Sequence, residues 1–323
     1  MTADAALNNP IDERGSPSLK TALGRNVTIL LAGTVVSQAI PIALAPVYTR
    51  IFSPESFGAW SAFVAVAAIL GSIGTGRYEL AVLLPKGDGE AGGVLRLAVS
   101  LAAFGGLIVC LPALIVRGRL AEALGDANLA AVVPFLGIST AMLGIWQGLS
   151  YWANRRGQFR RIAGSMVVQQ TTVAIVTISL GLGLHQSAGL IVGTLAGQAA
   201  AVLVLGQQIW REDSALFRGV TREQLRLLAQ RFYRFPLYNL PYGVLTTASV
   251  RMPVLLLTAF GALAAAGFVG FSRMVIFVPI TFVSASLGRV YFRTASATFG
   301  THRLEGLTVA LLEMMALSGP PVF

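Results

Sequence analysis

Charged residues are scarce in this sequence. Asp, Glu, Lys and Arg make up only 12% of the 323 residues, about half of their share in soluble domains. Hydrophobic residues account for 55% of the chain, and the mean hydropathy is +0.72. These values exclude an ordinary soluble domain and predict an integral membrane protein.

Cysteine and histidine are also rare. Cys110 is the single cysteine, so no disulfide can form within one chain. His185 and His302 lie far apart and lack the spacing of metal ligands. The sequence contains no nucleophile elbow, no paired carboxylates and no phosphate-binding loop. We therefore expect a protein that is not an enzyme and that has neither a metal site nor a cofactor.

Apolar runs of about 20 residues, the length that crosses a bilayer as a helix, recur along the chain without strand-like alternation. They predict an all-α polytopic membrane protein with eight spans and part of a ninth, which begins near Leu307. The expected organisation is a cytoplasmic tail, a six-helix transmembrane bundle, a cytoplasmic linker with an amphipathic helix, and an incomplete second bundle, at residues 1–26, 27–210, 211–236 and 237–323. The expected spans are 27–48, 58–76, 93–116, 129–152, 162–184, 187–210, 237–260 and 265–286.

Basic residues indicate how these spans are oriented. All but five of the 24 Lys and Arg residues fall in segments that are cytoplasmic if the N-terminus is cytoplasmic. The exceptions are Arg50, Arg117 and Arg119 in outer loops, and Arg251 and Arg273 inside spans. This asymmetry predicts a cytoplasmic N-terminus. It also explains the net charge of +10 without nucleic acid as a partner.

Arg251 and Arg273 each lie deep inside an apolar span. Inserting an arginine at the centre of a membrane helix costs roughly 2.5–3.5 kcal/mol. Both are expected about 12–14 Å below the outer surface, close to the membrane midplane. Neither span contains an acidic residue, so we interpret the pair as the lining of a cationic lumen that receives an anion. The structural alternative is that they satisfy backbone carbonyls where Pro253 or Pro279 breaks a helix.

Three further polar residues are candidates for lining or closing the same lumen. Gln38 lies at the same expected depth as the two arginines and is a candidate substrate ligand. Asn239 and Tyr242 lie at the inner mouth of the seventh span, where they could form a polar gate.

Acidic residues within or at the edge of spans are limited to Glu79 and Glu313. An ionisable residue in a membrane is a functional candidate by default, so either could bind a coupling cation or proton. The alternative for Glu79 is a local ion pair with Arg77.

Glycine recurs at every fourth position in the sixth span, at Gly189, Gly193 and Gly197. Small residues at this spacing let a neighbouring membrane helix approach closely. The stripe therefore predicts a packing face.

Two stretches resemble motifs of a known family: YTRIFSPESFG at residues 48–58 and RYELAVLLP at 77–85. PLYNLP at 236–241 and Ser272-Arg273 are similar to the opening of that family's second half. The family is the polysaccharide-export, or O-antigen flippase, branch of the multidrug/oligosaccharidyl-lipid/polysaccharide exporter superfamily.

This resemblance implies two helical bundles around a central lumen in the bacterial inner membrane. Such proteins move polyprenyl-diphosphate-linked oligosaccharides to the outer leaflet for surface polysaccharide and lipopolysaccharide biosynthesis. The diphosphate would be the counter-ion of Arg251 and Arg273, with Arg77 as a further cation. Coupling to H⁺ or Na⁺ is implied, as are a polysaccharide polymerase and chain-length proteins as partners. The incomplete second bundle makes a C-terminally truncated chain the expectation.

Other functions make different demands on the sequence. A cation-coupled multidrug exporter of the same superfamily would be expected to have a carboxylate inside its first bundle, and the first and the third to sixth spans contain none. A membrane glycosyltransferase or sugar polymerase would need a large polar loop, whereas the longest outer loop, 117–128, is short. A non-transporting assembly partner remains the third alternative.

The orientation can be tested with reporter fusions. Fusions after Gly157 and Gly219 should report a cytoplasmic position, because basic residues flank both sites, and a fusion at Gly125 should report an external one. An external signal at Gly219 would contradict the arrangement of six spans before the linker.

Overall fold

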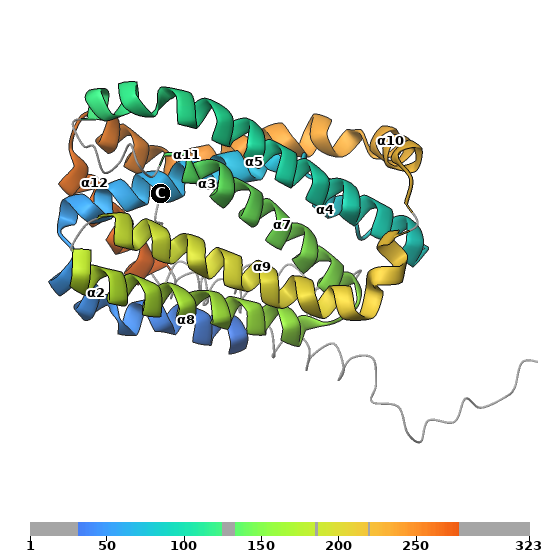
Figure 1. The fold of residues 1–323 in the computed structure, drawn as a ribbon, viewed down its shortest axis with the longest axis horizontal. Coiled ribbons are helices and arrows are strands. Elements are labelled where there is room, and N and C mark those ends of the chain that lie inside the picture. The colour runs from blue at the N-terminus through green and yellow to red at the C-terminus, as the bar shows by residue number, and fades with distance from the viewer. Residues whose placement is uncertain (1–31, 125–132, 185–186, 219, 278–323) are drawn as a thin grey trace, which may run out of the picture. The chain divides into compact units, whose positions relative to one another are not determined.

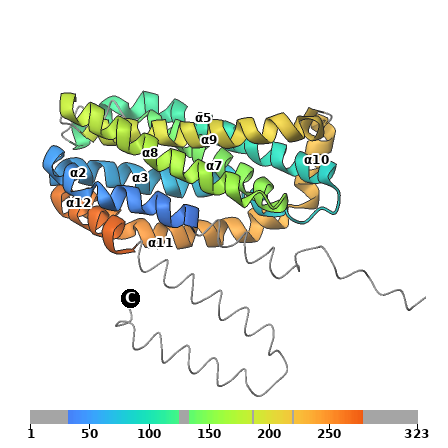
Figure 2. The ribbon, with the colours of Figure 1, turned by 90° about the horizontal axis from the view of Figure 1, so that it is seen from below.

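The computed structural model describes residues 32–124, 133–184, 187–218 and 220–277, and most of these residues are helical. The chain forms two compact units, Met1–Gly270 and Phe271–Phe323. In the first unit, the long helices run side by side in both views (Figures 1 and 2). No β-strand occurs in the described residues, so the predicted all-α class is confirmed.

The helices follow one another with short connections. In chain order they are Ala32–Ile51, which ends in α2 (Ala45–Ile51), then α3 (Pro54–Gly74), α4 (Tyr78–Ala81), α5 (Asp88–Leu124), α7 (Phe135–Arg155), α8 (Phe159–Leu184), α9 (Ser187–Arg218), α10 (Arg222–Arg231), the π-helix η1 (Phe235–Asn239), α11 (Leu240–Ala259), α12 (Leu263–Ser272) and the π-helix η2 (Arg273–Phe277).

Most of the expected spans coincide with long helices. Among the described residues, six helices are long and apolar enough to cross a membrane: Ala32–Ile51, Pro54–Gly74, Asp88–Pro112, Phe159–Gly183, Ser187–Phe217 and Phe235–Ala259. The helix α7, at the expected fourth span, is as long as α3 and carries more polar residues. The eighth span is described only as far as Phe277, and the ninth lies outside the described residues. The division into two bundles remains a prediction.

The glycine stripe of α9 packs against α8. A Cβ atom built on Gly193 would lie 2.0 Å from the Oγ1 atom of Thr177, and one on Gly197 would lie 2.3 Å from Cγ2 of Val173. Only glycine permits this approach at either position. The predicted close-packing face is confirmed at Gly193 and Gly197, whereas a Cβ atom on Gly189 would lie 3.5 Å from Cβ of Leu180, an ordinary contact.

An ionic network joins α5, α7 and α9 at one end of the first unit. Asp88 accepts hydrogen bonds from Arg155 and Arg156, and Arg156 also donates to Asp213 at 3.1 Å. The indole Nε1 of Trp152, a fully buried residue, donates to the other oxygen of Asp213 at 2.9 Å. Since both oxygens of Asp213 have donors, its burial is compensated.

The linker helix α10 is docked on the first unit. Thr221 and Gln224 form a reciprocal capping box at its start. Leu225, Ala229 and Phe232 pack beside Tyr78, Leu97 and Ala98. The hydroxyl of Tyr78 donates to the carbonyl of Ala229 at 3.0 Å. The predicted amphipathic helix therefore covers protein with its apolar face.

The helix α3 lies antiparallel to α11 and also contacts the start of α12. We call this contact, from the start of α12 to Arg77 after α3, the α3–α11 seam. At one end, a Cβ on Gly58 would lie 2.0 Å from the carbonyl oxygen of Leu263. A Cβ on Gly267 of α12 would lie equally close to the carbonyl oxygen of Pro54. The two backbones touch here with no side chain between them.

This contact predicts the effect of a single methyl group. Gly58→Ala should destabilise the fold by about 1–3 kcal/mol, because the backbone of Leu263 cannot yield as a flexible side chain would. The thermal unfolding temperature of the protein in detergent should fall by about 2–10 °C. Gly164→Ala is the matched control, since its Cβ would have nothing within 4 Å. A Gly58→Ala variant as stable as the control would contradict the contact.

Candidate functional site

The turn between α3 and α4 has an unusual backbone. Gly76 and Arg77 have φ angles of 59° and 61°, and Arg77 is the only non-glycine residue with a positive φ in the described part of the chain. A left-handed conformation costs a side-chain-bearing residue about 1–3 kcal/mol and is frequent at functional sites. The conformation directs the chain from the end of α3 into α4, where Glu79 follows.

Glu79 is a buried acidic residue whose charge is only weakly compensated by its neighbours. Its side chain is 1% exposed, and its Oε1 atom lies 3.6 Å from Nη1 of Arg77. Neither carboxylate oxygen has a hydrogen-bond partner within the described residues. A charge-assisted hydrogen bond would be about 2.7–2.9 Å long. The ion pair considered from the sequence therefore exists, but it leaves the carboxylate without donors.

Glu79 is therefore a candidate for binding a cation or a proton, because it is a buried ionisable group whose oxygens lack hydrogen-bond partners among the described residues.

The guanidinium of Arg77 lies against the backbone of α11. A Cβ on Gly243 would lie 1.9 Å from Nη2 of Arg77, so glycine is required for the arginine to occupy this place. This contact forms the second end of the α3–α11 seam. Reasoning from the sequence missed Gly243, although a glycine inside a helix costs about 1 kcal/mol and suggests a packing role.

Arg251 lies on the covered face of α11. At 100° per residue, Gly243, Thr247, Arg251, Val254 and Thr258 fall within about 80° of one another. These residues are buried or half-buried, whereas the opposite side carries the exposed Tyr242, Leu245, Met252 and Leu256. Arg251 therefore points to the protein side of the helix, about 12 Å along the axis from Gly243.

An apolar cavity follows Arg251 along the same face. It has a volume of about 240 Å³ and is bounded by α3, α7 and α11. Leu255 and Thr258 contribute to it from α11, and Ala59 and Phe63 from α3. The seam thus places a charged pair, a single arginine and an apolar cavity in sequence between its two glycine contacts.

The other predicted residues are spread along the chain. Gln38 is half-buried in the helix Ala32–Ile51, and Asn239 is the half-buried last residue of η1. Tyr242 is 72% exposed, on the side of α11 that faces away from Gly243. Arg273 is the half-buried first residue of η2, in the second unit. Glu313 lies outside the described residues.

Comparison with known proteins adds two matches. A family model described as "Polysaccharide biosynthesis protein" matches residues 47–323. Comparison with the curated proteins gave no match. Among solved structures, the chain is similar to one titled "Inward-facing conformation of a multidrug resistance MATE family transporter of the MOP superfamily", with a TM-score of 0.58, 16% identity, and coverage of 91% of this chain and 70% of that one. This likeness confirms the predicted fold of a polytopic helical membrane protein.

The weak compensation of Glu79 has a measurable consequence for stability. Glu79→Gln keeps the shape of the side chain and removes a buried charge that has no hydrogen-bond donor. We expect the unfolding temperature in detergent to stay unchanged or to rise. Asp213→Asn is the matched control, because Asp213 has two donors and its replacement should cost about 1–3 kcal/mol. If Glu79→Gln lowered the unfolding temperature as much as Asp213→Asn, Glu79 would be a structural ion-pair partner instead.

Proposed function

Since the chain belongs to the polysaccharide biosynthesis protein family, we propose that it is a flippase that moves a polyprenyl-diphosphate-linked oligosaccharide across the bacterial inner membrane. The resemblance found in the sequence is confirmed by the match over residues 47–323. Family and fold indicate a membrane transporter of polysaccharide biosynthesis rather than an enzyme. The observation that carries the proposed substrate is Arg251, a permanent cation on the covered face of a membrane-spanning helix.

Arg251 suits a diphosphate by its chemistry. The planar guanidinium can bind two phosphate oxygens at once, and an arginine side chain keeps its positive charge at physiological pH. A site inside the membrane is poor in water, which strengthens the attraction between opposite charges. The apolar cavity next to Arg251 along α11 would accept part of the prenyl chain. We propose Arg273 as a second cation for the substrate, with Gln38 and Arg77 as further polar ligands.

Alternating access requires a group that links ion binding to helix movement. We propose that Glu79 takes up the coupling H⁺ or Na⁺, because its oxygens lie buried without donors beside Arg77. Neutralising Glu79 would weaken its hold on Arg77, whose guanidinium contacts α11 at Gly243. The seam could then open at that end. Glu313 is the second candidate for coupling, and Asn239 and Tyr242 are proposed to gate the same end of α11.

The same proposal implies an orientation in the membrane and a set of partner proteins. The N-terminus would lie in the cytoplasm, where the lipid-linked oligosaccharide is made, and the flipped product would pass to a polysaccharide polymerase and chain-length proteins. The product class is surface polysaccharide, including lipopolysaccharide O-antigen.

The substrate role of Arg251 can be tested by complementation of a strain that lacks its own exporter. Arg251→Gln should reduce polysaccharide export about 10- to 100-fold, because a hydrogen bond to a charged group contributes about 1.5–3 kcal/mol. The protein level should change little, and Arg251→Lys should restore part of the export by keeping the charge. Arg226→Gln, on the exposed surface of α10, is the control and should export normally. Normal export by Arg251→Gln would contradict the cationic lumen, and loss of drug resistance without loss of export would favour a multidrug exporter.

A further inference from the structure

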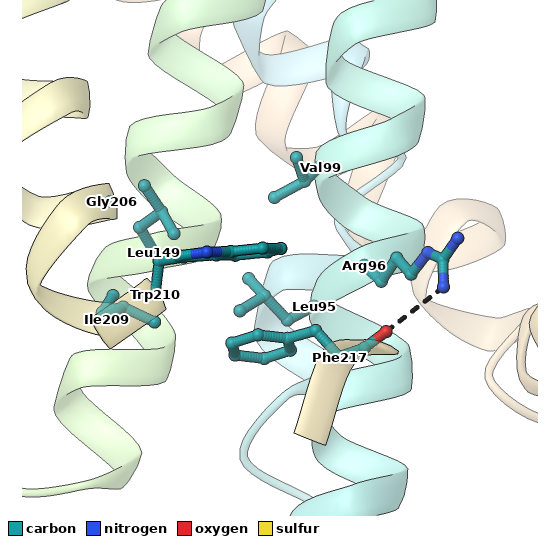
Figure 3. A pocket seen from close by; sticks show the side chains of 8 residues that line it. All are labelled: Leu95, Arg96, Val99, Leu149, Gly206, Ile209, Trp210 and Phe217. Atoms are coloured by element: carbon teal, nitrogen blue, oxygen red, sulfur yellow. Dashed lines mark hydrogen bonds between the residues drawn. The ribbon is translucent and has the colours of Figure 1, made fainter. Parts of the chain in front are cut away.

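A hollow of the first unit shares no lining residue with the apolar cavity of the α3–α11 seam. It has a volume of about 490 Å³ and lies between α5, α7 and α9. Leu95, Val99, Leu149 and Ile209 form apolar walls, and Figure 3 shows the indole of Trp210 reaching across the hollow from α9 toward α5.

Arg96 of α5 lines one end of this hollow. Its Nη1 atom donates to the carbonyl oxygens of Phe217 at 3.2 Å and of Val220 at 2.8 Å, as Figure 3 shows for Phe217. These bonds hold the C-terminal end of α9 against α5. The arginine therefore places a positive charge at the rim of an otherwise apolar space.

A second, shallow hollow lies on the open surface of α9 beside Trp210. It has a volume of about 470 Å³, and the described residues that line it all belong to α9: Val202, Leu203, Gly206, Gln207, Trp210 and Arg211. Gly206 and Trp210 border both hollows. Together the two spaces form a pair of apolar depressions separated by one indole ring, each with an arginine at its edge.

The position of Trp210 along α9 corresponds to a membrane interface. Starting at Ser187, about 20 residues cross the hydrocarbon core, which brings the helix to Gln207 and places Trp210 and Arg211 just beyond. Tryptophan and arginine are the side chains enriched at this depth. The side chain of Trp210 is 53% exposed and that of Leu203 is 60% exposed, so this part of α9 is accessible to lipid in the described structure.

The charged residues that line the two hollows, Arg96 and Arg211, are both basic. Among the residues that the structure describes, no acidic residue lines either hollow. The two acids that follow Arg211 are already paired, Glu212 with Arg161 and Asp213 with Arg156. A ligand here would meet apolar walls and two arginines at the rim.

We propose that these hollows bind an anionic phospholipid, with acyl chains on the two sides of Trp210 and the phosphate beside Arg96 and Arg211. The complementarity of two apolar grooves and a basic rim selects this occupant over a neutral lipid. A lipid so placed would fill the space between α5 and α9 and support the connection to α10. This inference does not depend on the transported substrate.

Quenching of tryptophan fluorescence tests the position of the lipid. The wild-type chain is reconstituted in vesicles in which a small fraction of the lipid carries bromine on its acyl chains. Brominated phosphatidylglycerol should quench more strongly than brominated phosphatidylcholine at equal fraction. The difference should disappear in Trp210→Phe, because Trp60, Trp146 and Trp152 do not line the hollows. Equal quenching by the two lipids would overturn the proposal.

A matched pair of glycine variants tests the space itself. The Cβ of a residue at Gly206 would touch only Cδ1 of Leu149, at 3.6 Å, so Gly206→Leu should fold and fill both hollows. Gly164→Leu on α8, where nothing lies within 4 Å, is the control. In native mass spectrometry with added phosphatidylglycerol, Gly206→Leu should lose the lipid adduct that the wild type and the control retain.

The headgroup contact is tested by Arg211→Gln, which should raise the apparent Kd for phosphatidylglycerol about fivefold and leave that for phosphatidylcholine unchanged. Retention of the adduct in Gly206→Leu, or equal weakening for both lipids in Arg211→Gln, would show a non-specific lipid surface and overturn the proposal. Stronger binding of undecaprenyl diphosphate than of phosphatidylglycerol would assign the hollows to the transported lipid and overturn it as well.

Discussion

The guanidinium of Arg77, beside the buried carboxylate of Glu79 and against the backbone of α11, is the contact around which the α3–α11 seam is arranged. A carboxylate that is 1% exposed and has no hydrogen-bond donor among the described residues needs a positive charge beside it. The left-handed turn at Gly76 and Arg77 supplies that charge and places it against Gly243. The position of α11 is thereby tied to a charged pair, and we propose that this pair changes when Glu79 takes up the coupling ion.

The two ends of the seam have opposite physical character. At Gly58 and Gly267 the backbones touch directly, and packed backbone has little freedom to rearrange. At Gly243 the contact is the end of a long, flexible arginine side chain. We propose that the glycine end is the pivot and the arginine end the part that separates during transport. Arg251 and the apolar cavity lie between them, where an opening seam would expose both.

The sequence predicts the features that depend on composition and periodicity. Apolar runs led to the all-α membrane fold, and sequence motifs led to the family. The glycine stripe led to a packing face on α9, but not to α8 as the helix that packs there. Contacts between distant segments could not be predicted in this way. The contact between Arg77 and Gly243 depends on the antiparallel register of α3 and α11. The left-handed φ of Arg77 depends on the packing around this residue. The exposure of Tyr242 likewise depends on how α11 is rotated about its own axis. The sequence alone does not determine this rotation.

Infrared difference spectroscopy of the protein in lipid measures the protonation of Glu79 most directly. Spectra are recorded with and without the lipid-linked oligosaccharide, for the wild type and for Glu79→Gln. If Glu79 is the coupling group for protons, adding substrate changes a carboxylic-acid carbonyl band in the wild type, and that change is absent from Glu79→Gln. Repeating the comparison with and without Na⁺ separates the two ions, because Na⁺ coupling changes the carboxylate bands instead. Identical difference spectra for the two proteins under both conditions would contradict the role of Glu79.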